Sequence, residues 1–180
     1  MENAIKRYTH APAHYFLSKA TYMVTAGTFQ KELFMRADKA KSCLLTLLRG
    51  AIDRYKWELI AWVILANHYH MLLKAPDTAS SLPWLLKKLH SSSAIELNKL
   101  ARCPGRKVWW NYWDTCITNE KSYYARLNYI HWNPVRHGVA DRPEDYPFSS
   151  YCDYYKLDSA RVRHLEQTYP FDRVKVFDEF

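Results

Sequence analysis

The sequence predicts an α+β fold built around an antiparallel sheet. Leucine-rich segments with helical spacing, 39–56 and 82–101, alternate with apolar or aromatic segments of strand length. Apolar residues make up 48% of the 180 residues, which is enough for a substantial core. No apolar run reaches the roughly 18 residues of a membrane span, and the N-terminus has no apolar signal segment. We therefore expect a protein without a membrane span.

The first half of the chain is expected to form a strand, a helix and two further strand segments. Residues 14–29 are rich in Tyr, Phe, Val and Thr, which favour strands. Residues 39–56 carry an apolar stripe opposite lysines and arginines, as an amphipathic helix does. Two apolar runs follow, 57–66 and 68–74, separated by Asn67. Asn favours turns, so the sequence leaves open whether these runs form one long strand or a hairpin.

The second half begins with another helix, which Ser80 or Ser81 caps and which runs to about Ala101. A basic turn over residues 102–107 leads into an aromatic strand over residues 108–118. The order strand, helix, strand, strand, helix, strand is that of a ferredoxin-like βαββαβ fold.

An additional helix follows the predicted sheet. Asn119 caps it, it spans residues 120–133, and Pro134 stops or kinks it. From residue 141 onward the sequence is turn-rich and polar. We therefore expect a catalytic body over residues 1–140 and a C-terminal extension over residues 141–180 that packs on the body or is partly disordered.

Charge is unevenly distributed along the chain. Residues 1–140 hold 20 Lys and Arg against 9 Asp and Glu, and residues 141–180 hold 6 against 9. A basic body suggests a polyanionic partner, nucleic acid first. The 14 tyrosines and 7 tryptophans add rings on which unpaired bases stack. A basic protein whose aromatic residues simply fill its core fits the composition equally well.

The four cysteines are scattered and form no Cys-x-x-Cys pair. This spacing argues against a zinc ribbon and favours free thiols in a reducing compartment. We therefore expect a cytoplasmic protein, and a nucleic-acid partner would make it nucleoid-associated.

Two histidines, His68 and His70, stand in the apolar segment AWVILANHYHMLLK. Successive side chains of a strand alternate between its faces, so the two rings point the same way, about 7 Å apart, and Tyr69 points to the other side. Neutral imidazole is a common metal ligand. Two core histidines that bind backbone carbonyls are the alternative, because His-x-His often occurs by chance.

The helix over residues 120–133 presents a second set of polar groups. Its expected buried stripe contains Tyr123, Leu127 and Ile130, and Tyr129 lies off that stripe. Residues four apart share a helix face, so Tyr129 and Asn133 point together. Spacing alone does not single out Tyr129 among the 14 tyrosines.

The pair His68-Tyr69-His70, followed about 60 residues later by YIHWNPVRHGV and RPEDYPFSSY, resembles the REP-associated tyrosine transposases. These form part of the single-tyrosine branch of the HUH endonuclease superfamily. The resemblance runs from roughly His14 to Tyr151. The tract from Tyr129 to Gly138 is its most specific part.

The resemblance implies a ferredoxin-like, metal-dependent endonuclease that acts on single-stranded DNA. His68, His70 and Asn133 would bind Mg or Mn, and Tyr129 would be the nucleophile that becomes joined to a 5′ phosphate. Members of the family bind imperfect DNA hairpins. Relatives of the insertion-sequence type work as dimers, so we expect a homodimer, with a monomer as the alternative.

Basic side chains near the expected site and in the basic segments are candidates for contacts with the DNA backbone. They are Lys87, Lys88, Arg102, Arg106, Lys107, Arg126 and Arg136.

Three rival functions stay open at this point, and one of them is a structural protein with no site, which leaves the two-part motif unexplained. Of the other two, the first is a module of the same fold that binds single-stranded or hairpin nucleic acid without cutting it. The second is a metal-dependent hydrolase in which His68 and His70 share the ion with a carboxylate, for which Glu58 and Asp114 are candidates.

Overall fold

The computed structural model describes residues 17–172 and residue 174. Its strands are β1 (Thr21–Thr28), β2 (Glu58–Ile64), β3 (His68–Lys74) and β4 (Trp109–Ile117). Its α-helices are α1 (Asp38–Tyr55), α2 (Leu82–Leu100), α3 (Glu120–Arg136), α4 (Tyr151–Leu157) and α5 (Ser159–Thr168). Three single turns of 3-10 helix, Phe29–Lys31, Ala79–Ser81 and Pro143–Asp145, join these elements.

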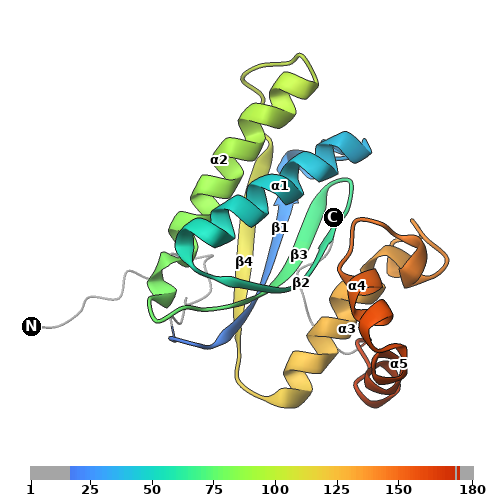
Figure 1. The fold of residues 1–180 in the computed structure, drawn as a ribbon. Helices are drawn as coiled ribbons and strands as arrows, with labels where there is room; N and C mark the ends of the chain where they lie inside the picture. The colour runs from blue at the N-terminus through green and yellow to red at the C-terminus, as the bar shows by residue number, and fades with distance from the viewer. Residues whose placement is uncertain (1–16, 173, 175–180) are drawn as a thin grey trace, which may run out of the picture.

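The four strands form one sheet in the order β2-β3-β1-β4, and every neighbouring pair is antiparallel. With the helices α1 and α2 as connections, this is the ferredoxin-like βαββαβ arrangement, so the predicted fold is confirmed (Figure 1). The strands β3 and β1 are central, and β2 and β4 form the edges.

The segment around Asn67 forms a hairpin, which answers the question that the sequence left open. The strands β2 and β3 pair antiparallel, with Ile64 opposite Tyr69. The amide of Leu65 donates to the carbonyl of His68 at 2.8 Å and closes a loop of two residues. The histidine pair therefore begins β3 directly after a tight turn.

The first strand is shorter than expected, because β1 begins at Thr21. Residues 17–20 form a turn in which the Leu17 amide donates to the Tyr22 hydroxyl. Residues 14–16 of the predicted strand lie outside the described ranges.

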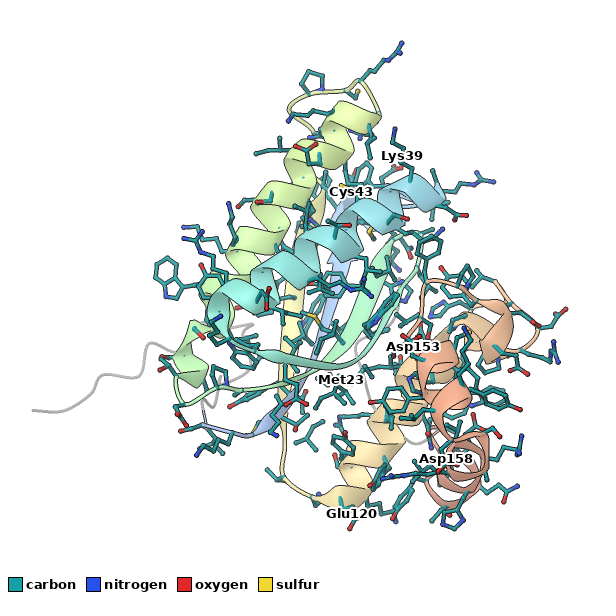
Figure 2. The ribbon with its side chains drawn as sticks, viewed as in Figure 1. Met23, Lys39, Cys43, Glu120, Asp153 and Asp158 are labelled. Carbon is teal, nitrogen blue, oxygen red and sulfur yellow. The ribbon has the colours of Figure 1, made fainter. Side chains whose placement is uncertain are left out.

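Two helical layers cover the two faces of the sheet (Figure 1). Both α1 and α2 pack on one face through a large apolar cluster that includes Tyr22, Leu48 and Leu85. A smaller cluster packs α3 on the other face and includes Leu72 and Ile130. Side chains fill both layers (Figure 2). Burial of these clusters stabilises the domain and holds α3 against the face that carries the histidines.

The helix α3 continues past Pro134 to Arg136, so of the two expected outcomes, a stop or a kink at this proline, the stop was wrong. Proline removes a single backbone N–H, and the last turn keeps other bonds: the amides of His137 and Val139 donate to the carbonyls of Asn133 and Pro134 at 3.1 and 2.9 Å. The extra turn brings Arg136 and His137 to the histidine pair.

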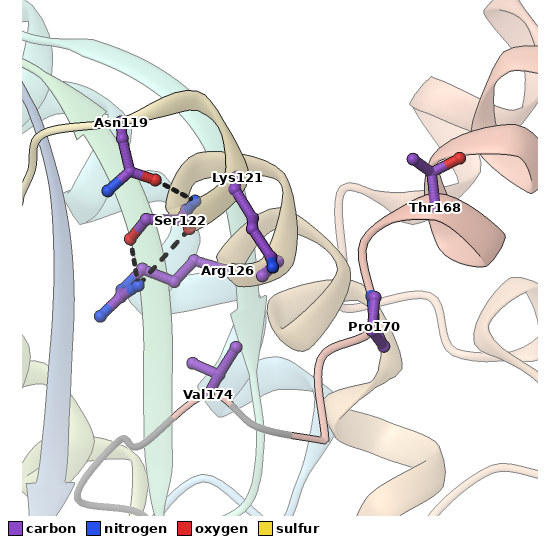
Figure 3. A pocket seen from close by; sticks show the side chains of 8 residues that line it. Asn119, Lys121, Ser122, Arg126, Thr168, Pro170 and Val174 are labelled. Carbon is purple, nitrogen blue, oxygen red and sulfur yellow. Dashed lines mark hydrogen bonds between the residues drawn. The ribbon is translucent and has the colours of Figure 1, made fainter.

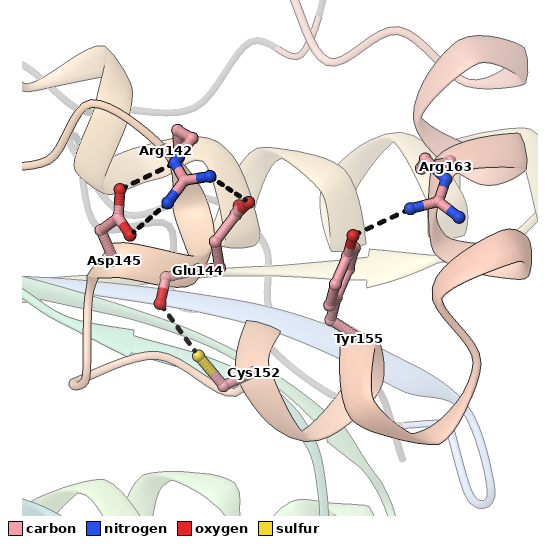
Figure 4. Close-up of polar contacts among 6 residues, drawn as sticks. All are labelled: Arg142, Glu144, Asp145, Cys152, Tyr155 and Arg163. Carbon is pink, nitrogen blue, oxygen red and sulfur yellow. Dashed lines mark hydrogen bonds and ion pairs between the residues drawn. The ribbon is translucent and has the colours of Figure 1, made fainter.

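Residues 141–172 pack against the outer side of α3. The Asn128 amide donates to the carbonyls of Leu165 and Tyr169 at 2.9 and 2.8 Å. The Trp132 indole donates to Glu166 at 2.8 Å. Figure 4 shows polar contacts of this segment, in which Arg142 binds Asp145 and Glu144, Cys152 donates to the Glu144 carbonyl, and Arg163 binds Tyr155. Through the contacts of Asn128 and Trp132, α3 is held between the sheet and the C-terminal segment.

Within the described ranges, no helix is long and apolar enough to cross a membrane. The cysteines Cys43, Cys103, Cys116 and Cys152 are all free thiols.

Candidate active site

His68 and His70 both lie buried on the sheet face that α3 covers, with 1% and 0% of their surfaces exposed. Their rings are 5.0 Å apart between centroids. The register pairs His68 with Gly27 and His70 with Thr25 of β1. The predicted shared orientation of the two rings is therefore seen in the structure.

Thr25 of β1 holds one ring nitrogen of His70. Its Nδ1 atom lies 2.7 Å from the hydroxyl oxygen of Thr25. Burial, together with positive charge on His137 and Arg136, lowers the pKa of His70 to about 3. The ring is therefore neutral at pH 7, which is the form that binds metal ions.

Asn67 orients His68 in the same way. Its amide nitrogen donates to the Lys31 carbonyl at 3.4 Å, and its oxygen faces the Nδ1 atom of His68 at 2.8 Å. In the tautomer whose ring proton is on Nδ1, facing the Asn67 oxygen, Nε2 carries the lone pair. A hydrogen-bonded Nδ1–H is the usual arrangement of a histidine that binds a metal through Nε2.

The Nε2 atom of His68 lies 3.3 Å from Oδ1 of Asn133, which is fully buried on α3. In the tautomer with the proton on Nδ1, two lone-pair atoms face each other, and a shared cation stabilises such a pair. Adjacent ligand atoms of an octahedral Mg²⁺ ion lie about 3 Å apart, which this spacing matches. The donors present therefore fit a divalent cation.

The protein's own ligand set would be small. In the part of the chain that the structure describes, no three His, Cys, Asp or Glu side chains are arranged to hold one ion. An ion here would rely on the two imidazoles and the Asn133 amide, and water or substrate oxygens would complete its shell. Because these protein ligands are neutral, the ion would keep its full charge for an anionic substrate.

Tyr129 lies beside the histidine pair, and it is fully buried. Its ring meets the His70 ring edge-on, with 5.3 Å between centroids. We expected Tyr129 off the buried stripe of its helix, which was wrong. The sheet packs on one side of α3, and α5 contacts Asn128 on another, so the helix has no single buried stripe.

Arg136 and His137 close the site at the end of α3. The Arg136 guanidinium lies over the Tyr129 ring, 4.5 Å from its centroid, and its own side chain is exposed. The His137 ring lies 4.8 Å from that of His68. Burial and the charge of Arg136 lower the pKa of His137. The positively charged guanidinium of Arg136 thus lies on the solvent side of Tyr129.

A pocket of about 610 Å³ lies beside the start of α3 (Figure 3). Arg126 lines it and binds both the hydroxyl and the carbonyl of Ser122. Lys121 adds a second positive charge. Arg126 comes one turn before Tyr129 on the same helix face, so a basic side chain of the pocket lies one helical turn from the buried tyrosine.

The other predicted DNA contacts lie outside the tyrosine helix. Lys87 and Lys88 are exposed on α2, which covers the opposite face of the sheet. Arg102, Arg106 and Lys107 follow α2 in the turn before β4. Of the seven candidates, the structure brings only Arg126 and Arg136 to the tyrosine helix.

Neither carboxylate of the hydrolase hypothesis joins the histidine pair. The register places Asp114 opposite Val24 and His70 opposite Thr25, and neighbouring residues of β1 face opposite sides. Glu58 pairs with Lys74 at the far end of β3, where the two side chains form an ion pair of 3.5 Å. The structure therefore does not support a metal site shared with these acids.

Thr25, Asn67 and His137 belong to the site, although the sequence did not reveal them. Asn67 precedes His68 directly, a signal that could have been used. Thr25 becomes visible only through the strand register, and His137 only because α3 continues past the proline.

Comparisons with known proteins agree with this architecture. Residues 17–133, more than half of the chain, match the family described as Transposase IS200 like. The REP-associated tyrosine transposase of Escherichia coli (strain K12) is 30% identical over 139 residues, which cover 72% of this chain and 79% of that protein. A putative REP-associated tyrosine transposase of Haemophilus influenzae is 27% identical over 108 residues, covering 55% and 61%.

The fold is also that of a solved REP-associated tyrosine transposase bound to a REP hairpin. The TM-score is 0.67 at 21% identity, and the match covers 98% of this chain and 95% of that one. The chain therefore belongs to the IS200-like transposase family and, within it, to the REP-associated tyrosine transposases.

Proposed function

We propose that the protein is a metal-dependent endonuclease that binds hairpin DNA and cuts an adjoining single strand through a covalent 5′-phosphotyrosine. The observation that carries the proposal is the convergence of His68, His70, Asn133 and Tyr129 from β3 and α3. The relative bound to a REP hairpin supports hairpin DNA as the substrate class.

In the proposed reaction the Tyr129 oxygen attacks a backbone phosphorus. The new bond joins that oxygen to phosphorus, and the bond from phosphorus to the preceding 3′ oxygen breaks. The phenol loses its proton and the released 3′ oxygen takes one up, which leaves a free 3′-hydroxyl. Since one phosphodiester is exchanged for another, the bond energy is conserved and the strand can be rejoined.

The protein's residues would divide the work as follows. His68, His70 and Asn133 would hold a Mg or Mn ion, which when bound supplies a positive charge for a phosphate oxygen. Arg136 lies over the Tyr129 ring and is exposed, so an incoming phosphate would meet its guanidinium first. Arg126 and Lys121 would hold the strand next to the nucleophile.

Tyr129 is buried in this structure, so the site is closed to a DNA strand. The Tyr129 ring has 0% exposed surface, and an in-line attack needs the phenol oxygen at the phosphate. We propose that substrate binding draws the Arg136 guanidinium onto the phosphate and uncovers Tyr129. In this proposal the DNA substrate itself opens the site.

A cleavage assay tests the function. The substrate is an end-labelled DNA hairpin with the native sequences that flank this gene, incubated with Mg or Mn and separated on a denaturing gel. We expect metal-dependent cleavage by the wild-type chain and none by His68→Ala. Asn133→Asp keeps an oxygen ligand at the same place and should retain cleavage, which separates loss of the metal site from loss of the fold.

The second candidate function is hairpin binding without cleavage. Tight binding on a native gel, with no cleavage in either metal, would favour this binding module. The homodimer expected from insertion-sequence relatives is a separate proposal, which light scattering on the free protein and on its hairpin complex tests.

A further inference from the structure

A cluster of two aromatic rings and a lysine stands at the start of β4. The Lys107 ammonium lies 4.6 Å from the Phe29 ring centroid and 4.5 Å from that of Trp110. The two rings are 5.7 Å apart and tilted by 40°. A cation is attracted to the faces of aromatic rings, so the lysine and the two rings form one contact cluster in the protein alone.

Trp110 is one of the most exposed large apolar side chains, with 58% of its surface accessible. Its position follows from a bulge at the sheet edge: Gly27 pairs with Asn111 and Thr28 pairs with Trp109, so Trp110 has no partner in the ladder. Bulges redirect side chains and are frequent next to active sites. Here the bulge leaves Trp109 in the core and Trp110 at the surface.

The two chain segments that meet beside Trp110 are rich in basic residues. Residues 28–36 and 101–112 contain five basic residues and a single acid, Glu32. The basic residues are Lys31, Arg36, Arg102, Arg106 and Lys107. An exposed ring among positive charges suits a ligand that has both flat apolar faces and negative charge, as a nucleotide does.

The cluster is linked to the proposed active site through Asn67. The amide of Thr28 donates to the Asn67 carbonyl at 2.8 Å, and the Asn67 side chain binds both Lys31 and His68. Across the sheet, Gly27 pairs with His68 on one side and with Asn111 on the other. Two strand spacings place the backbones of His68 and Asn111 about 10 Å apart. Trp110 directly precedes Asn111, so one DNA strand can reach both the proposed active site and the cluster.

We infer that Trp110, Phe29 and Lys107 form a platform on which an unpaired base of the substrate strand stacks. The inference rests on the proposed function, which identifies the strand as DNA. It adds the place at which that strand leaves the active site. Trp110 would supply the ring face, and Lys107 would neutralise a neighbouring phosphate. The platform would favour a hairpin that carries a single-stranded arm over the same hairpin without one.

Fluorescence anisotropy without added metal tests the platform. The probes are a fluorescein-labelled DNA hairpin with blunt ends and the same hairpin with a short thymidine arm on the 5′ or the 3′ side. We expect wild-type protein to prefer one armed hairpin. Trp110→Ala should raise its Kd by roughly 5- to 100-fold and leave the Kd of the blunt hairpin unchanged.

Two further variants make the comparison specific. Trp110→Phe keeps an aromatic face and should bind the armed hairpin within about threefold of wild type. Trp84→Ala is the matched control, because Trp84 is 61% exposed and also lies under a lysine, Lys87, but stands on α2. This variant should bind as wild type does. Equal melting temperatures of the variants would exclude loss of folding.

An abasic site at one thymidine of the arm completes a thermodynamic cycle. If the base stacks on Trp110, the abasic site weakens wild-type binding, and it adds no further loss in Trp110→Ala. An equal effect of Trp110→Ala on armed and blunt hairpins, no effect on either, or a wild-type chain that does not prefer an arm would each overturn the inference. Cleavage is scored separately, so a missing platform and a missing endonuclease activity give different results.

Discussion

The Nε2 atom of His68 and the Oδ1 atom of Asn133 lie 3.3 Å apart, although 65 positions separate the two residues in the chain. The strand β3 supplies one atom and the helix α3 the other. Asn67 binds the second nitrogen of the same imidazole, and in the tautomer with the proton on that nitrogen the His68 lone pair faces the amide oxygen. The histidine pair of β3 and the polar face of α3 therefore meet at one point, and we expect a cation to bind there.

Substitution of Asn133 tests the cation directly. Asn133→Leu has similar size and no ligand oxygen, and we expect it to weaken Mn²⁺ binding by roughly 10-fold or more. Asn133→Asp adds a charged oxygen and should bind Mn²⁺ at least as tightly as wild type. Isothermal titration calorimetry measures both without any DNA. Equal affinity of wild type and Asn133→Leu would show that the amide is no ligand.

Thr25 is expected to act as a positioning residue for His70. Thr25→Val keeps the shape of the side chain and removes the oxygen that lies 2.7 Å from Nδ1. Leaving this buried nitrogen without its partner should cost about 1–3 kcal/mol of unfolding free energy and weaken Mn²⁺ binding. Thr25→Ser should restore both, which urea unfolding and calorimetry measure. A stable Thr25→Val chain with wild-type metal affinity would contradict the role.

Buried histidines predict that acid destabilises the fold. Burial lowers the pKa of His90 and of His131 to about 3, below the ordinary value of 6.5. Below pH 6.5 the unfolded chain takes up protons that the folded chain refuses, so stability falls as pH falls from about 6.5 toward 3. Each such histidine contributes a slope of up to about 1.4 kcal/mol per pH unit.

The histidine effect is measured by urea unfolding at several pH values between 7 and 4.5. His131→Gln has no group that titrates in this range and should reduce the slope. The change keeps a polar group near the Ser150 hydroxyl, which lies 3.0 Å from the His131 ring. A variant whose stability depends on pH as steeply as that of wild type would exclude His131 as a source.

The two arginines of α3 should differ in their effects. Arg136 lies over the Tyr129 ring, so Arg136→Ala should slow cleavage at saturating DNA by roughly 2- to 30-fold. Arg126 lines the pocket one turn away, so Arg126→Ala should mainly raise the Kd for DNA and reduce its dependence on salt. Single-turnover cleavage and binding titrations separate the two. An unchanged rate in Arg136→Ala would remove it from the reaction.

Much of the fold could be predicted because apolar periodicity reports burial. The leucine stripes located α1 and α2, and the apolar segment around His68 located β3. The course of α3 was harder to predict, since periodicity assumes one buried stripe and α3 is enclosed by the sheet and by α5. The bonds that keep α3 helical past Pro134 depend on its last turn, which residue types alone do not determine.

The candidate site was predictable only in part, for a related reason. His68 and His70 share a strand face by local geometry, and Tyr129 and Asn133 share a helix face. Nothing local showed that the two faces meet, and that expectation came from the family resemblance. Thr25 reaches His70 through strand register, a long-range property that short sequence patterns do not carry.

The central claim is that Tyr129 becomes joined to DNA, and its most direct test is the mass of the protein after reaction. Wild-type protein, Tyr129→Phe and Tyr123→Phe are each incubated with flank-bearing hairpin DNA and Mn²⁺, then resolved on a denaturing gel and weighed by mass spectrometry. We expect a DNA adduct in wild type and in Tyr123→Phe, and none in Tyr129→Phe or with metal chelated. Strand cleavage by Tyr129→Phe, or an adduct that maps to another residue, would contradict the account.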